Sequence, residues 1–288
     1  MSLVAISMVL ASAFMHASWN LLAKRVGSGR GPVYVWLFDA LATLIYAVPA
    51  LILILLLKPK FGLLEVVFIL GSATLHLTYF ILLQQGYKKG DLSLVYPLAR
   101  GTGPVLSTTC AILLFGERPG ILAIIGAVLV ASGVFILTGG VGKIRHSQAR
   151  EAIIFGLLTG VLIAGYTLWD KQAVSTYQIQ PLFLYYFSTM VRMLLLAPYA
   201  LRYRPEIQQA WQEHRLEVLG VSLLSPLSYF LVLTALVFTP VSYVAPFREI
   251  SILVGAILGT RLLAEKDSAR RTIAAGAMVL GVVSLALG

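Results

Sequence analysis

The sequence alternates long apolar runs with short polar connections. Each run is close to the roughly 20 apolar residues that a transmembrane helix needs. The runs do not alternate in polarity at every second residue, as strands of a membrane barrel do, and they are about twice as long as such strands. The pattern therefore predicts ten transmembrane helices, at residues 3–23, 33–57, 66–87, 92–115, 120–139, 152–170, 181–201, 217–238, 240–260 and 272–288.

Composition agrees with an all-α integral membrane protein. Hydrophobic residues make up 59% of the 288 residues and charged residues only 12%, with a mean hydropathy of +0.89. Soluble domains carry roughly 25% charged residues, so a soluble enzyme, a disordered chain and a secreted disulfide scaffold are excluded. The single cysteine, Cys110, excludes an intramolecular disulfide and a cysteine metal cluster.

The positive charges predict the orientation of the chain in the membrane. Fifteen of the 22 Lys and Arg residues lie in the odd-numbered connections and four in the even-numbered ones. Cytoplasmic connections carry the excess of Lys and Arg, so both termini are expected outside the cytoplasm. Because the net charge of +10 sits in short connections between spans, the expected partner is the lipid bilayer and not nucleic acid.

The two halves of the chain resemble each other at an offset of about 150 residues. Residues 77–83 (LTYFILL) match residues 227–233 (LSYFLVL), Pro97 matches Pro246, and Glu117 matches Glu265. The expected organisation is a first five-helix repeat at 1–142, a cytoplasmic linker at 143–151 and a second repeat at 152–288. An odd number of spans inverts the second repeat, as in many secondary transporters.

With these halves, the proline-centred stretches 95–100 (VYPLAR) and 244–249 (VAPFRE), and the turns at Glu117 and Glu265, the chain resembles the drug/metabolite transporter superfamily in its EamA-type ten-helix form. The resemblance implies membrane transport of amino acids and other small metabolites, usually outward, in a bacterial inner membrane. It also implies that the first, third, fourth, sixth, eighth and ninth helices line a central cavity.

Charged residues inside the runs are the first candidates for a substrate site, because charge in hydrocarbon is costly and usually faces a cavity or a partner. Arg100, Arg248 and Glu249 follow the prolines at equivalent places in the two halves. In one interpretation the arginines face a substrate carboxylate and Glu249 a substrate ammonium or proton. In the other, Arg100 and Glu249 form a buried structural pair between the halves. Pro97 and Pro246 are expected to break their helices locally.

Aromatic and polar residues extend the candidate substrate-binding set. His76 and Tyr79 share a helical stripe with i, i+3 spacing, and Tyr229 occupies the matching stripe in the other half. The alternative is helix packing through polar side chains. Further candidates are Trp19, Asn20, Tyr96, Tyr166 and Tyr243, for which an interfacial aromatic belt is the alternative. Asp39 and Arg192, also inside runs, are expected to be structural or gating residues.

The function predicted from these patterns is an amino-acid exporter that works by alternating access through a cavity between the repeats. The alternative is a carrier of phosphorylated or other anionic metabolites. The sequence contains neither a nucleophile–base pair nor a zinc motif, so we expect no enzyme, no cofactor and no metal. The small-molecule substrate is expected to be an amino acid, and the protein a monomer, with a dimer as the alternative.

Overall fold

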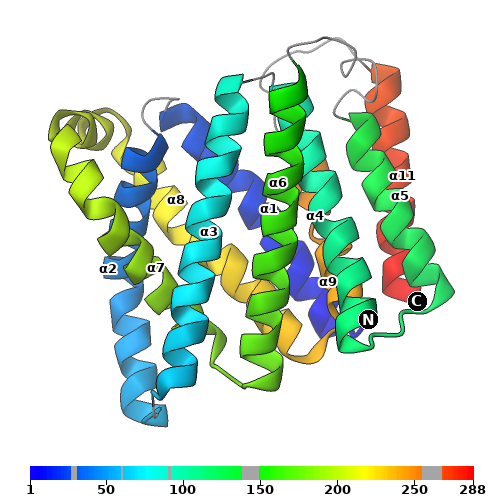
Figure 1. The fold of residues 1–288 in the computed structure, drawn as a ribbon, viewed down its shortest axis with the longest axis horizontal. Coiled ribbons are helices and arrows are strands. Elements are labelled where there is room, and N and C mark those ends of the chain that lie inside the picture. Colours follow the sequence, from blue (N-terminus) through cyan, green and yellow to red (C-terminus); the bar gives the residue numbers. More distant parts are fainter. Residues whose placement is uncertain (27–30, 60, 90–91, 138–148, 255–267) are drawn as a thin grey trace.

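In the computed structural model, residues 1–26, 31–59, 61–89, 92–137, 149–254 and 268–288 are described. Every regular element among these residues is a helix (Figure 1). Their bounds are α1 Leu3–Val26, α2 Gly31–Leu57, α3 Leu63–Lys89, α4 Leu92–Phe115, α5 Ile121–Leu137, α6 Ala149–Lys171, η2 Gln172–Thr176, α7 Pro181–Ala200, η3 Leu201–Tyr203, α8 Arg204–Phe238, α9 Val241–Phe247 and α11 Ser268–Leu287.

The predicted all-helical class is confirmed, and each predicted run overlaps a helix. By length and composition, six helical stretches in the described part of the chain can cross a membrane: Leu3–Ala23, Gly31–Leu57, Leu63–Lys89, Leu98–Phe115, Arg150–Thr176 and Pro181–Phe238. The last stretch contains both α7 and α8, and α8 itself changes direction at His214, whose φ of −134° is not helical. Two shorter helices, Ile121–Ile136 and Ile273–Leu287, are also apolar. The number of ten spans stays a prediction.

The two chain ends lie at the same end of the molecule, next to the connection between α4 and α5 (Figure 1). The terminal amino group of Met1 donates to the backbone oxygen of Ala286 at 3.3 Å, which ties the N-terminus to α11. This arrangement is the one expected from an even number of spans. The side of the membrane that this end faces is still inferred from the charge pattern alone.

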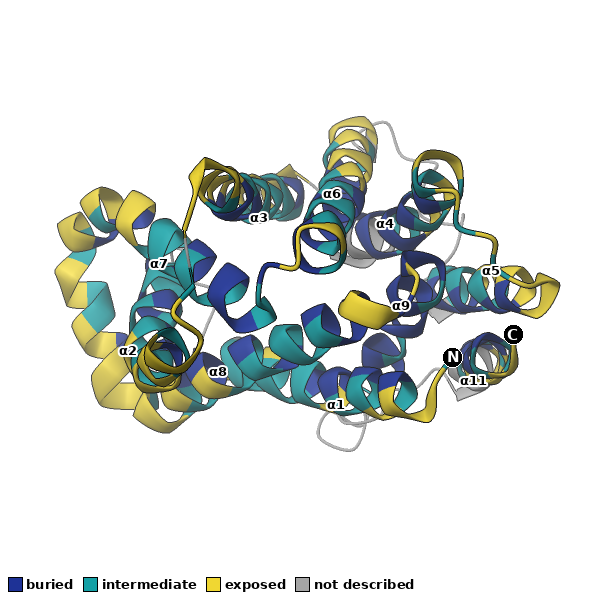
Figure 2. Ribbon diagram, turned by 90° about the horizontal axis from the view of Figure 1, so that it is seen from below, coloured by how far each residue is buried: buried dark blue, intermediate teal, exposed yellow. Residues whose placement is uncertain are grey.

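The two halves of the chain are interlocked and do not form separate bodies. α2 packs on α7, α3 on α6, α1 on α8, α4 on α9 and α5 on α11. Each of these pairs joins a helix of the first half to a helix of the second. Figure 2, viewed along the helices, shows α3, α6 and α4 in one row and α8 and α1 in the other. The interface between the halves is therefore a large part of the interior.

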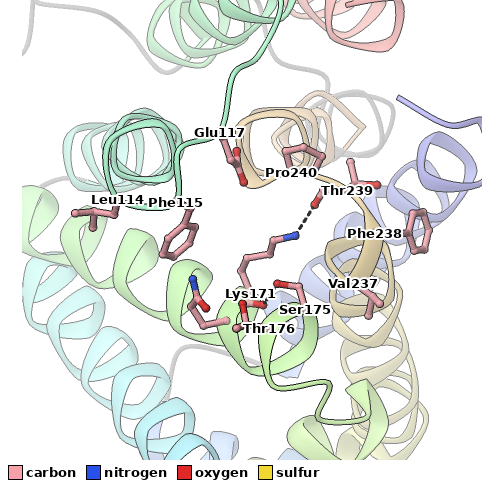
Figure 3. A pocket seen from close by; sticks show the side chains of 11 residues that line it. Leu114, Phe115, Glu117, Lys171, Ser175, Thr176, Val237, Phe238, Thr239 and Pro240 are labelled. Atoms are coloured by element: carbon pink, nitrogen blue, oxygen red, sulfur yellow. Dashed lines mark hydrogen bonds between the residues drawn. The ribbon is translucent and has the colours of Figure 1, made fainter.

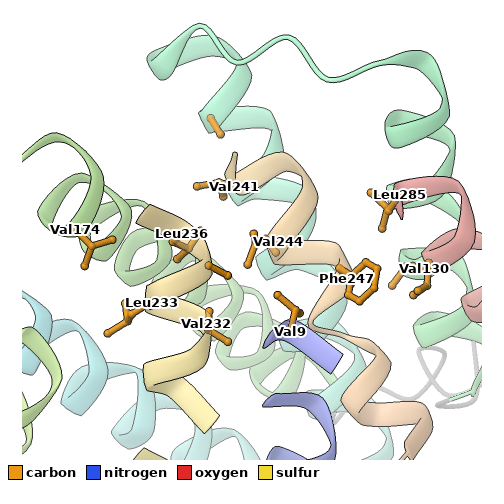
Figure 4. Close-up of a cluster of buried hydrophobic side chains, with 14 of the residues drawn as sticks. Val9, Val130, Val174, Val232, Leu233, Leu236, Val241, Val244, Phe247 and Leu285 are labelled. Carbon is orange, nitrogen blue, oxygen red and sulfur yellow. The ribbon is translucent and has the colours of Figure 1, made fainter. Parts of the chain in front are cut away.

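The main apolar core surrounds the end of α8 and the short helix α9 (Figure 4). Its buried members come from both halves and include Val9, Val130, Val174, Leu233, Leu236, Val244, Phe247 and Leu285. On the outer surface, by contrast, Leu56, Leu113 and Ile121 are 72%, 74% and 76% exposed. Apolar exposure on this scale suits a surface that faces lipid.

Local sequence explains several helix ends. Pro181 occupies the first turn of α7, and the side chain of Gln180 accepts a hydrogen bond from the Leu182 N–H at 2.7 Å. Gly116 has a φ of +67°, which a glycine adopts without strain, and it follows the last residue of α4. The chain thereby turns so that Glu117 reaches α9.

The two prolines expected to break helices differ in effect. α9 ends at Phe247, one residue after Pro246, and Arg248 and Glu249 lie in a turn before helix resumes at Ile250. The break expected at Pro97 is wrong, because α4 runs without interruption from Leu92 to Phe115. Pro97 is only the sixth residue of α4, so the helix before it is little more than one turn and loses few hydrogen bonds.

α5 and α11 approach each other at a pair of glycines. A Cβ atom added to Gly126 would lie 2.6 Å from the Gly281 backbone oxygen, and one added to Gly281 would lie 2.8 Å from the Gly126 oxygen. The helices therefore touch backbone to backbone, as small residues permit in membranes.

We expect Gly126→Ala to destabilise the protein by about 1–3 kcal/mol, because the added methyl group overpacks a contact made by backbone. The matched control is Gly276→Ala, where an added Cβ meets no atom within 4 Å. Thermal unfolding of both variants in detergent, followed by circular dichroism, would measure the difference. Equal midpoints for the two variants would contradict the close packing of α5 on α11.

Candidate functional site

A buried ion pair joins the two halves at the centre of the molecule. Arg100, on α4, places Nε 2.9 Å from Oε2 of Glu249, in the turn after α9. The two side chains are only 6% and 2% exposed. The Arg100 guanidinium also donates to the Ser251 hydroxyl at 3.4 Å. Both members are buried and oppositely charged, so charge is the main source of attraction in this contact.

Arg248 lies beside this pair and points to a different partner. Its guanidinium donates to the Tyr166 hydroxyl on α6 at 3.1 Å and stands 5.9 Å from the centre of the Tyr166 ring. Its Nε has no hydrogen-bond partner among the described residues. Arg248 is 7% exposed, so it is a buried cation that donates to a tyrosine hydroxyl.

Four predicted aromatic or imidazole residues form one cluster. The rings of His76 and Tyr166 are stacked with centroids 4.1 Å apart, and Tyr79 meets Tyr166 edge-on at 5.7 Å. Tyr229, on α8, meets the His76 ring at 5.2 Å. Tyr166 is buried at this centre, so the interfacial belt considered for it is wrong. The helical spacing of His76 and Tyr79 places both rings on the face of α3 that meets Tyr166 of α6, and His76 also meets Tyr229 of α8.

Asp170 completes the cluster, and sequence reasoning missed it. Its Oδ2 accepts a hydrogen bond from the Tyr229 hydroxyl at 2.6 Å and lies 3.1 Å from Nε2 of His76. The Asp170 side chain is fully buried. It stands at the end of a predicted span, directly before Lys171, where it resembled a boundary residue. Its acid character within a helical stretch was the signal that could have identified it.

A second buried ion pair connects α2 to α7. Arg192 donates to both oxygens of Asp39, at 3.0 and 3.1 Å, and to the Thr189 hydroxyl at 3.2 Å. The two-pronged geometry is the strong form of an arginine–carboxylate contact. Both residues were expected to be structural or gating residues, and in this structure they neutralise each other.

Two other predicted residues, Tyr243 and Asn20, make their hydrogen bonds outside the cluster. Tyr243 accepts from the Gly120 N–H at 3.2 Å and donates to the Gly288 oxygen at 3.0 Å, so it holds α5 and the C-terminus together. The exposed Asn20 side chain donates to the backbone of its own helix. Trp19 contacts His16 edge-on at 4.9 Å. The side chain of Tyr96 and the whole of Glu265 lie outside the described residues.

An open pocket lies at the end of the molecule where α4 and α8 finish (Figure 3). Its volume is about 530 Å³, and it is lined by Leu114, Phe115, Glu117, Lys171, Gln172, Ser175, Thr176, Val237, Phe238, Thr239 and Pro240. Lys171 donates to the Leu236 and Thr239 backbone oxygens at the end of α8. Glu117 accepts from the first two N–H groups of α9, at 2.7 and 2.9 Å.

These two side chains hold the connection between α8 and α9 from opposite sides. Lys171 satisfies oxygens left free at a helix C-terminus, and Glu117 satisfies N–H groups left free at a helix N-terminus. The pocket therefore opens beside the connection between α8 and α9, which hydrogen bonds from α6 and from the α4–α5 turn hold in place. In the described part of the chain, no group of three or more His, Cys, Asp or Glu side chains could hold a metal ion.

Comparison with known proteins is consistent with this architecture. The model of the EamA-like transporter family matches the chain twice, over residues 3–139 and 150–287. A solved structure titled "Crystal structure of protein" is similar at a TM-score of 0.81 and 13% sequence identity, over 98% of this chain and 96% of that chain. At this identity the likeness shows the fold alone. No curated protein matches the sequence.

We expect Arg100→Met to lower stability by about 3–5 kcal/mol, because it leaves the Glu249 carboxylate buried without its counter-charge. The double variant Arg100→Met/Glu249→Gln removes both charges and should recover at least half of the loss. Thermal unfolding of the wild type, both single variants and the double variant in detergent completes the cycle. Additive effects of the two substitutions would show that the pair is not coupled.

Proposed function

The chain belongs to the EamA-like transporter family, whose members are membrane transporters of small metabolites, and on that premise we propose that it exports amino acids by alternating access. The observation that carries this proposal is the placement of buried charge. Each buried ion pair described above has one partner in each half: Arg100 with Glu249, and Asp39 with Arg192. Movement of one half against the other must therefore remake these contacts.

The proposed substrate site is the cluster where α3, α4, α6, α8 and the turn after α9 meet. Arg248 binds the substrate carboxylate, because it is the buried arginine of this cluster that lacks an acidic contact shorter than 4.0 Å among the described residues. Aromatic rings form the walls. The proposed contact residues are those of the expected set that meet in this cluster: His76, Tyr79, Arg100, Tyr166, Tyr229, Arg248 and Glu249.

The charges favour an amino acid over an anionic metabolite. Three arginines inside the helices suggested the alternative of a phosphorylated substrate. Two of them, Arg100 and Arg192, have a carboxylate partner at 2.9 and 3.0 Å. A doubly charged anion would need several uncommitted cations, whereas a single carboxylate needs one. The proposed setting is a bacterial inner membrane with both termini on the periplasmic side, and the proposed state is a monomer.

We expect purified protein in liposomes loaded with the 20 unlabelled amino acids to exchange at least one labelled L-amino acid with saturable kinetics. Labelled glucose 6-phosphate should not exchange. Arg248→Gln should lower amino-acid exchange about 10- to 100-fold, because it removes a charge-assisted hydrogen bond to the carboxylate. Filter assays of retained label would give both rates.

The matched control is Arg202→Gln, at an exposed arginine in η3. This variant should exchange amino acids at the wild-type rate. Protein-free liposomes should show no exchange. Exchange of glucose 6-phosphate without any amino acid would overturn the proposal in favour of the anionic alternative. Wild-type exchange by Arg248→Gln would remove Arg248 from the site.

A further inference from the structure

Two oppositely charged side chains in the buried cluster have no ion pair with an arginine or a carboxylate among the described residues. Arg100 and Glu249 neutralise one another, as do Asp39 and Arg192. Arg248 and Asp170 remain. Arg248 donates to the Tyr166 hydroxyl, while Asp170 contacts the Tyr229 hydroxyl and His76. The two groups are connected through the stacked rings of Tyr166 and His76.

The Asp170 carboxylate is only half satisfied. Both of its polar contacts reach Oδ2, whereas Oδ1 has no hydrogen-bond partner among the described residues. The side chain is 0% exposed. A buried carboxylate oxygen without a donor is costly, so such an atom in an otherwise paired cluster points to a missing ligand.

We propose that Asp170 binds the primary ammonium group of the transported substrate through Oδ1, while Arg248 binds its carboxylate. This inference rests on the proposed function and changes its site, because Glu249 was the expected partner of the ammonium group. Glu249 already has the Arg100 cation at 2.9 Å, so it has less charge to offer a second cation.

The surroundings of Asp170 suit an organic ammonium group. The rings of His76, Tyr166 and Tyr229 contact one another around it, and Tyr185 lies 5.7 Å from Tyr229. Aromatic faces attract ammonium groups, and more strongly where water is excluded. A metal ion would require several hard oxygen or nitrogen ligands, and the described residues form no such group.

Asp170 directly precedes residues of α6 and η2 that line the pocket between α4 and α8. Its neighbour in sequence, Lys171, lines the pocket and donates to the end of α8. The π-helical turn η2 begins at the next residue, Gln172, and provides further polar lining. The residues that follow Asp170 in the sequence therefore give this pocket part of its polar lining.

The test compares three probes in the liposome assay: an exchanged amino acid, its 2-hydroxy acid and its decarboxylated amine, which for phenylalanine are phenyllactate and phenethylamine. The wild type should exchange the amino acid at least about 100-fold faster than the hydroxy acid, which lacks the ammonium group. Asp170→Asn should exchange the amino acid at least about tenfold more slowly than the wild type, and the hydroxy acid at the wild-type rate. The preference for the ammonium group should therefore shrink.

Glu151→Gln is the matched control, because it removes an exposed acid, 61% exposed, that pairs with Lys89 on the surface. It should keep the wild-type preference. If Asp170→Asn does not fold, Asp170→Glu keeps the charge but shifts it by one methylene group. That variant should keep the preference with at least a threefold higher KM for the amino acid, and an unchanged KM would overturn the proposal.

The two proposals fail in different ways. A folded Asp170→Asn protein that keeps the wild-type preference, or a wild type without any preference, overturns the ammonium site while amino-acid transport stands. If the wild type exchanges no amino acid, the proposed function fails. The ammonium site is then judged on phenethylamine: exchange that depends on Asp170 supports it, and absence of exchange overturns it.

Discussion

The structure depends on one constraint: a charge buried among apolar helices needs a partner, and three such contacts in this protein join one half of the chain to the other. Arg100 reaches Glu249, Asp39 reaches Arg192, and His76 reaches Asp170. None of these contacts is available to a half on its own. The apolar surfaces hold the helices in the bilayer, but the charges specify which helices of the two halves lie together.

The same constraint connects the fold to transport. In the proposed alternating-access mechanism the contacts between the halves change, and uncompensated charge would make that change costly. A zwitterionic substrate carries both signs of charge and can satisfy groups that the protein alone leaves half satisfied. Arg248 and Asp170 are such groups, with an unpartnered Nε and an unpartnered Oδ1 among the described residues. A purely anionic substrate would leave the carboxylate unsatisfied.

Hydrogen bonds at helix ends are the second feature that positions the buried charges. Lys171 and Glu117 satisfy backbone groups on either side of the connection between α8 and α9. Because α9 leads directly to Arg248 and Glu249, its position sets the position of both charges. The pocket at the ends of α4 and α8 is lined by the same two residues, Glu117 and Lys171. The α9 helix therefore connects the residues that line the pocket to the two charges of the buried cluster.

The sequence by itself determined the helical class, the approximate place of each helix and the two related halves, and it named seven residues that meet in the buried cluster: His76, Tyr79, Arg100, Tyr166, Tyr229, Arg248 and Glu249. These properties follow from local hydropathy and from charge in short connections, which depend little on packing. Tertiary structure decided which charges meet. Arg100 and Glu249 were possible partners from sequence, but Asp39 with Arg192 and the contacts of Asp170 depend on the rotation and register of helices far apart in the chain. A shift of one residue turns a helical side chain by about 100°, so neither hydropathy nor repeat spacing could identify these contacts.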